Sequence, residues 1–276
     1  MKLNFEALLP GIRPWVMNLV NVWPAYIVKP QYANWEVLHI LSLTLLGGAA
    51  ILMNLRLLNV GIVEEPPSEI YRNLRRWQDV GVIGIVVSGV LIGMANAEKL
   101  YDSTAFVVKM CALVGGVILT YGASRPVARA DGEVSGAAKL WFLVGAAFWI
   151  VGLVILVTGV LINVGVYHIL TAAALVALVA LPGRLRWMWL AGLLVLIAAQ
   201  QGITHLAYAG DDIKHLDPVN KVFTWLYALW ILGGGVARFL VTRRETRQGV
   251  FVQLIAWSTI LVWITGAAAG RWIAFE

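Results

Sequence analysis

Long apolar blocks, separated by short polar connections, dominate the pattern along the chain. Blocks of 18 or more apolar residues are typical of helices that cross a bilayer. Hydrophobic residues make up 60% of the chain and charged residues 13%, where a soluble domain has about 25% charged residues. The pattern therefore predicts an all-α integral membrane protein of about eight transmembrane helices, at 35–58, 77–96, 105–124, 139–162, 164–182, 187–208, 219–241 and 250–273.

Residues 1–34 differ from the rest, because aromatic residues alternate there with prolines. Trp15, Trp23 and Tyr26 are examples. Amphipathic aromatic rings settle at membrane interfaces, so this segment is expected to lie along one. A further surface helix is expected at 64–76, with Ser68 as its N-cap.

The basic residues predict the orientation. Thirteen of the 21 lysines and arginines fall on one side of the predicted spans, in clusters next to the span ends. The positive-inside rule places that side in the cytoplasm and both termini in the periplasm of a bacterial inner membrane. Because the basic residues lie in short loops between spans, they indicate orientation and not nucleic-acid binding.

Similar residues recur in the same order in the two halves of the chain. From residue 76 onward the separation stays between 110 and 114 residues. We infer two tandem four-helix repeats, 35–162 and 163–276, that follow the interfacial segment 1–34 and are related by an axis along the membrane normal. The matching pairs include His39 and His168, Trp77 and Trp187, Gly89 and Gly202, Lys109 and Lys221, and Trp149 and Trp263.

All four histidines fall at the predicted periplasmic end. His39, His168 and His205 each lie about four residues inside a span, which is about 6 Å below the interface. Ionisable groups at this depth are costly and suggest a function. His215 lies in the loop between the sixth and seventh spans, on the same side.

Histidines at equal depth on neighbouring helices suit a b-type haem held by two imidazoles. His168 could pair with His39 across the repeat axis, or with His205 on the next span. Lys109, Lys221 and Arg271 lie at a similar depth and could pair with the haem propionates. The more ordinary interpretation is that these side chains snorkel or form hydrogen bonds between helices.

A metal-ion site is an alternative. Glu36 and His39 share one helical face, as in iron or zinc bundles, and copper is a further candidate. Gly165 stands where the second half would repeat Glu36. Asp211, Asp212, His215 and Asp217 form an acidic loop, for which plain solvation is the simpler explanation. The single cysteine, Cys111, excludes an intrachain disulfide and a CxxC site.

Several short motifs carry a family resemblance. Leu38-His39 with Leu55-Arg56-Leu57-Leu58, Phe106-x-x-Lys109, and Trp263 with Gly270-Arg271-x-Ile273-Ala274 resemble a bacterial inner-membrane family known as domain of unknown function number 6644. Departures are Asn54 for Asp, Phe275 for Tyr, and about four further spans in the middle. The family is distantly similar to copper-resistance D membrane proteins. The resemblance implies location and architecture and leaves the activity open.

Three functions are therefore expected as alternatives. The first is electron transfer through haem b, from quinol to a periplasmic redox partner. The second is a copper- or metal-handling, transporter-like protein. The third is an accessory subunit without a cofactor, in a larger membrane complex or a homo-oligomer. The sequence holds no Walker loop, nucleophile elbow or H-E-x-x-H motif.

Overall fold

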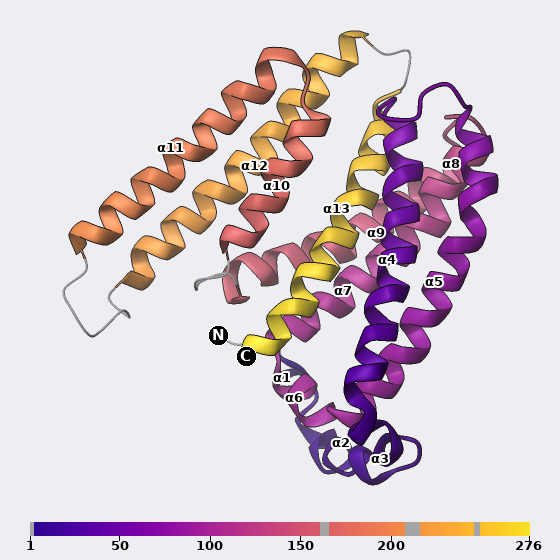
Figure 1. Cartoon of the computed structure of the whole chain (residues 1–276), viewed down its shortest axis with the longest axis vertical. Coiled ribbons are helices and arrows are strands. Elements are labelled where there is room, and N and C mark those ends of the chain that lie inside the picture. The colour runs from indigo at the N-terminus through magenta and orange to yellow at the C-terminus, as the bar shows by residue number, and fades with distance from the viewer. Residues whose placement is uncertain (1–2, 161–165, 208–215, 246–248) are drawn as a thin grey trace. The chain divides into compact units, whose positions relative to one another are not determined.

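The computed structural model describes residues 3–160, 166–207, 216–245 and 249–276. Every regular element in these ranges is helical (Figure 1). Helices satisfy their own backbone hydrogen bonds, which is the requirement for a chain that crosses lipid. The predicted all-α class is confirmed.

Seven helical stretches are long and apolar enough to span a membrane. Four of them follow one another in the first 160 residues, and three more lie beyond residue 182. The spans contain α4 (Tyr32–Leu57), α5 (Pro67–Ala95), α7 (Thr104–Ile118) with α8 (Arg125–Arg129), α9 (Gly136–Ile155), α11 (Gly183–Ala207), α12 (Asp217–Glu245) and α13 (Val250–Trp272).

The predicted span 164–182 corresponds to α10 (Val166–Ala180), which has 15 residues. A helix that crosses the hydrocarbon core needs about 20 residues. Residues 161–165 lie outside the described ranges, so eight spans remain a prediction beside the seven that are long enough.

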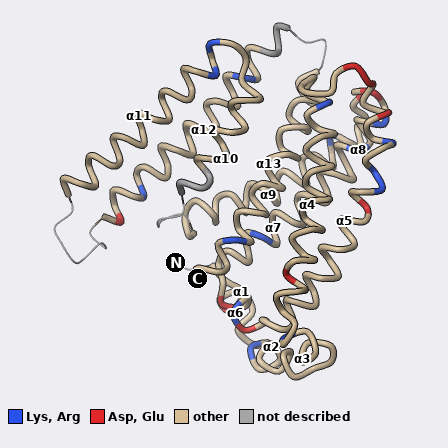
Figure 2. The backbone as a smooth tube through the Cα atoms, viewed as in Figure 1, with Lys and Arg blue, Asp and Glu red and all other residues tan. Residues whose placement is uncertain are grey.

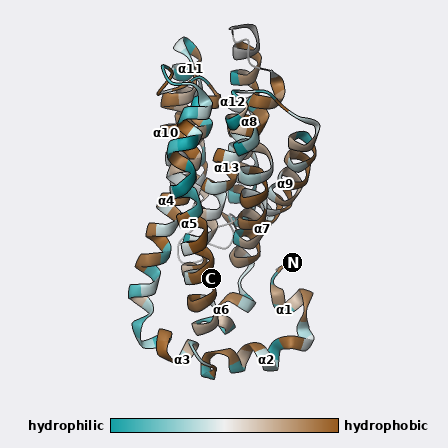
Figure 3. Cartoon of the chain, turned by 90° about the vertical axis from the view of Figure 1, so that its right-hand side faces the viewer, coloured by the Kyte–Doolittle hydropathy of each residue, from teal (hydrophilic) through white to brown (hydrophobic). Residues whose placement is uncertain are grey.

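The segment before the first span folds into short helices. These are α1 (Phe5–Leu8), α2 (Arg13–Asn18) and α3 (Ala25–Val28). Together with α6 (Ala97–Asp102) they form a layer at one end of the spans (Figure 3). Within this layer, Arg13 on α2 forms an ion pair with Asp102 on α6 at 3.2 Å. Trp15 and Trp23 are largely exposed, as expected of an interfacial segment.

The predicted surface helix 64–76 is not separate from the second span. It is the first part of α5, which runs from Pro67 to Ala95. Ser68 does not cap it through its side chain. Instead, the Ser68 backbone N–H donates to the Asp131 carboxylate at 2.8 Å, so a loop residue satisfies one of the free amides at this helix start.

The chain divides into two compact units, Met1–Ile155 with Val250–Glu276, and Leu156–Gly249. We call them unit 1 and unit 2. In unit 1, α13 packs against α7, α4 and α9, although the predicted repeats place residues 250–276 in the second half. A compact unit and a sequence repeat are different properties, so the repeats stay a prediction.

Glycines bring the helices of unit 1 close together. A Cβ atom at Gly81 would lie 2.6 Å from the Leu46 backbone nitrogen, and one at Gly145 would lie 3.1 Å from the Gly115 carbonyl oxygen. Small residues at such crossings let backbones approach within membranes, where packing replaces the hydrophobic drive.

Helices α9 and α13 place matching residues against α7. A Cβ atom at Gly152 would lie 3.0 Å from Cys111, and one at Gly266 would lie 3.4 Å from Ala112. The paired tryptophans also behave alike, since both indoles donate to a threonine at 3.0 Å: Trp149 to Thr265 and Trp263 to Thr120. The two glycines thus both face α7, while the two indoles donate to different elements, Trp149 to α13 and Trp263 to the turn after α7.

Unit 2 contains α10, α11 and α12. Trp189 on α11 donates to the Trp230 carbonyl at 3.0 Å, and Trp230 on α12 donates to the Trp189 carbonyl at 3.1 Å. A side chain at Gly192 would overlap the Trp230 ring, and one at Gly234 the Trp189 ring. This reciprocal pair holds α11 against α12.

Candidate functional site

His39 is the centre of a polar group at the predicted periplasmic end of unit 1. Its side chain is only 7% exposed. Its Nδ1 atom lies 2.9 Å from the Ser88 Oγ atom on α5, and its Nε2 atom lies 3.2 Å from the Lys109 Nζ atom on α7. One histidine therefore links three spans.

The partners assign the protonation of the ring. The Ser88 hydroxyl donates to the Gly84 carbonyl at 2.5 Å, so its oxygen accepts the proton of His39 Nδ1. The lone pair of Nε2 then accepts a hydrogen bond from the Lys109 ammonium, because an ammonium can only donate. His39 is thus a neutral imidazole with its basic nitrogen turned toward a cation.

Glycine makes room for this ring. A Cβ atom at Gly89 would lie 3.2 Å from the His39 Cε1 atom. Ser88 and Gly89 are consecutive on α5, so the first supplies the hydrogen-bond partner and the second the space. Sequence reasoning missed Ser88. A lone serine followed by glycine in an apolar stretch is the signal that could have found it.

The Lys109 side chain extends from α7 to His39 and passes Gly270 on α13. A Cβ atom at Gly270 would lie 3.7 Å from the Cδ, Cε and Nζ atoms of Lys109, so glycine leaves space for the lysine stem. Glu36, one turn before His39, is exposed. Within the described ranges no carboxylate lies within ion-pair distance of Lys109. An ammonium at this depth without a paired acid is costly.

Within unit 1, the predicted site residue Arg271 does not join this group. Arg271 is exposed and lies over the Phe275 ring at 4.8 Å. In unit 2, His205 on α11 and Lys221 on α12 are exposed. The side chain of His168 on α10, and Asp211, Asp212 and His215, lie outside the described residues. The pairing of His168 with His39 or His205 stays a prediction.

Metal ligands do not cluster in the structure as far as it is described. It contains no group of three or more histidine, cysteine, aspartate or glutamate side chains able to hold an ion. Of the predicted metal set, Glu36 and His39 share α4, and His205 belongs to unit 2. His168 has no described side chain.

A second polar group lies at the opposite end of unit 1. Asp79 follows Arg75 and Arg76 closely in sequence, but neither of them is its ion-pair partner. Asp79 pairs with Arg125, at 2.8 Å, and accepts from Tyr121 at 2.9 Å. The Arg125 guanidinium lies over the Tyr121 ring and also donates to Gln78 at 2.6 Å.

This second group fastens α5 to the end of α7. Tyr121 lies in the π-helical turn η4 (Leu119–Ser124), and Arg125 begins α8. Nearby, the Ser124 hydroxyl donates to the Asn54 side-chain oxygen at 2.7 Å, and both residues are fully buried. Asn54 thus places a neutral amide in the interior of unit 1. These groups satisfy one another, which suits a structural role.

The family comparison covers the helices that build both polar groups. A model of a family of unknown function (DUF6644) matches residues 25–165, which include His39, Ser88, Lys109 and Arg125. His168, His205 and the closing Gly270-Arg271 motif lie beyond the matched residues. The likeness to copper-resistance D proteins stays a prediction. Searches of curated proteins and of solved structures gave no match. Because the family model matches half of its length, the chain belongs to the family of unknown function DUF6644.

Proposed function

We propose that this protein is a membrane-embedded electron-transfer protein of the haem b type, which takes electrons from quinol to a periplasmic partner. One observation carries the proposal. His39 is a buried, neutral imidazole whose Nδ1 proton is held by Ser88 and whose Nε2 lone pair accepts from Lys109, a flexible side chain, and not from a fixed backbone group.

The residues at His39 fit a haem iron in their donor chemistry. A histidine that ligates a metal through one ring nitrogen usually donates the other N–H to a fixed acceptor, as His39 does to Ser88. When bound, haem supplies one-electron transfer. The partner of His39 on this proposal is His168; the alternative pair, His168 with His205, does not use His39.

Lys109 is the part of the site that must move. It occupies the Nε2 lone pair of His39, and its flexible four-carbon stem runs beside Gly270. A carboxylate of a bound ligand close to His39 would draw the Lys109 ammonium away from the ring and form a charge-assisted hydrogen bond with that ammonium. Lys109 is therefore the residue we assign to an anionic group of the ligand.

The visible absorption spectrum of the purified full-length protein tests the proposal. We expect a Soret band and sharp α and β bands after reduction, as low-spin haem b gives. Iron should be present at about one atom per chain, or per two chains if the ligands come from two copies. A protein with no haem bands, after expression with sufficient haem supply, would exclude this function.

A cofactor-free accessory subunit is the second candidate. It is favoured by the hydrogen bond between Lys109 and His39 Nε2, because both groups then already have a partner. On this proposal the polar group holds α4, α5 and α7 in register. Elemental analysis separates it from the metal-handling alternative, which requires bound copper, iron or zinc.

The membrane arrangement belongs to the same proposal. We place the protein in a bacterial inner membrane, with eight spans in two tandem repeats and the His39 group near the periplasmic face. The basic residues at the end of unit 1 opposite to His39 support this orientation.

A further inference from the structure

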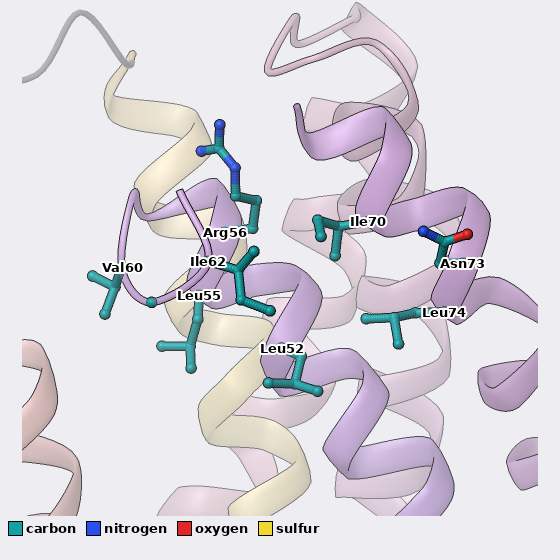
Figure 4. Close-up of a pocket in the computed structure, with 9 residues that line it drawn as sticks. Leu52, Leu55, Arg56, Val60, Ile62, Ile70, Asn73 and Leu74 are labelled. Carbon is teal, nitrogen blue, oxygen red and sulfur yellow. The ribbon is translucent and has the colours of Figure 1, made fainter. Parts of the chain in front are cut away.

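A small pocket lies at the end of unit 1 opposite to His39, between the last turn of α4 and the start of α5 (Figure 4). Its volume is about 170 Å³. Nine residues line it, and they come from α4, the connection after it, and α5: Leu52, Leu55, Arg56, Val60, Gly61, Ile62, Ile70, Asn73 and Leu74.

The pocket is apolar inside and open to the outside. Leucine, isoleucine and valine side chains form most of its lining, and Leu52 and Ile62 are about half exposed. An apolar cavity of about 150 Å³ holds a benzene molecule. A pocket of this size therefore takes a short stretch of hydrocarbon chain.

Arg56 places a positive charge at the edge of this apolar surface. In Figure 4 its guanidinium lies above Ile62 and points away from the leucines. Its Nε atom donates to the Glu65 carbonyl and its Nη1 atom to the Asn59 side chain. These bonds fix the guanidinium, while Nη2 donates to no described residue and no described acid pairs with it.

Arg56 is the one charged side chain among the residues that line the pocket. Arg75 and Arg76 are exposed on the first turns of α5, at the same end of the unit (Figure 2). Glu69 is already paired with Arg72. Glu64 and Glu65 lie in the connection, but neither forms an ion pair with Arg56. An apolar chain joined to a phosphate matches both the lining and the rim.

We propose that this pocket binds one acyl chain of an anionic phospholipid, whose phosphate pairs with Arg56. Arginine forms charge-assisted, often bidentate, hydrogen bonds with phosphate oxygens. Basic pockets between spans on the cytoplasmic side bind anionic headgroups in this way. The proposal does not depend on the haem, because the pocket and the His39 group lie at opposite ends of α4.

Native mass spectrometry of the detergent-purified protein tests it, with equal amounts of phosphatidylglycerol and phosphatidylcholine that carry the same chains. One arginine near the surface contributes about a five-fold preference for an anionic lipid. We expect that preference in the first lipid bound by the wild type. Arg56→Gln should reduce it to parity, and Arg129→Gln, an exposed arginine at the end of α8 that does not line the pocket, should keep it.

Ile62→Trp provides a second test that leaves Arg56 in place. The indole should fill the pocket and reduce the first bound lipid of both kinds. Three results would each overturn the proposal. The wild type could show no preference for phosphatidylglycerol, the Arg56→Gln protein could keep that preference, or the Ile62→Trp protein could bind both lipids as the wild type does.

Discussion

At the scale of single residues, one buried histidine and one half-buried lysine form the most unusual group in unit 1. Several hydroxyl groups inside the spans bond to the carbonyl four residues earlier on their own helix, as those of Ser42 and Thr259 do. Such bonds satisfy a hydroxyl without linking helices. His39 instead bonds to two other helices, through Ser88 and Lys109. Its interactions are specific to the tertiary structure, which suits a functional position.

The ligand assignment gives the first prediction. His168→Ala should abolish the low-spin haem spectrum, because a six-coordinate iron needs two imidazoles, and His39→Ala should abolish it as well if His39 is the partner of His168. His168 is common to both predicted pairings, so its loss is the more decisive. His215→Ala, in the predicted loop, should leave the Soret and α bands intact. A His168→Ala protein with wild-type bands would show that the ligand assignment is wrong.

At the scale of helices, the apolar blocks predict the spans well where the chain is continuously apolar. The block 35–58 becomes α4, Tyr32–Leu57, and 105–124 becomes the stretch from Thr104 to Ser124. The prediction fails at α5, which begins ten residues before the block at 77, because a helix continues through polar residues outside the hydrocarbon.

The partners of polar side chains could not be predicted in the same way. Asp79 has two arginines beside it in sequence, yet it pairs with Arg125 from another helix. Ser88 lies 49 residues from His39. Which face of a span meets which neighbour depends on packing, and in an apolar helix the hydrophobic pattern carries little information about that face.

Close packing of α4 and α5 gives the second prediction. Gly81→Ala should destabilise the protein by about 1–3 kcal/mol, because its Cβ atom would meet the Leu46 backbone at 2.6 Å and the helices would have to separate. Gly48→Ala is the matched control. It lies on α4 with nothing within 4 Å of the added atom, so the melting temperature should be unchanged or higher.

Thermal unfolding in one detergent measures both variants. Equal melting temperatures for Gly81→Ala and the wild type would mean that α4 and α5 are not in this close contact. A large loss in both variants would point to a general intolerance of alanine and not to this helix crossing.

At the scale of the whole chain, the closing residues belong to the first unit. Gly270 leaves space for the Lys109 stem, which gives a physical reason for the glycine in the closing motif. Glu276 accepts from the Ser103 hydroxyl at 2.6 Å and from the Ala105 backbone at 3.0 Å, so it satisfies the start of α7. The last helix therefore completes the bundle that holds His39. Sequence order alone predicts that this helix belongs to the second repeat, 163–276.

Both ends of the chain meet at one end of unit 1. Asn4 donates to the Asp102 carbonyl at 3.0 Å, and Lys99 donates to the Ala274 carbonyl at 3.4 Å, so α6 contacts both terminal segments. The clustered arginines of α4, α5 and α8 lie at the opposite end (Figure 2). The structure of unit 1 thus agrees with the sequence grouping of basic residues, while the side of the membrane that each end faces remains a prediction.

Cysteine labelling tests that orientation and is the last prediction. The test uses two single-cysteine variants in a Cys111→Ala background. Ala274→Cys introduces an exposed thiol beside the C-terminus, and Ala130→Cys introduces one beside the arginine-rich end. The positive-inside rule predicts that a membrane-impermeant maleimide labels Ala274→Cys in intact spheroplasts and Ala130→Cys only after permeabilisation. The reverse pattern would place the termini in the cytoplasm. His39 would then lie at the cytoplasmic face, and a periplasmic electron acceptor would be excluded, because the redox site would be on the wrong side of the membrane.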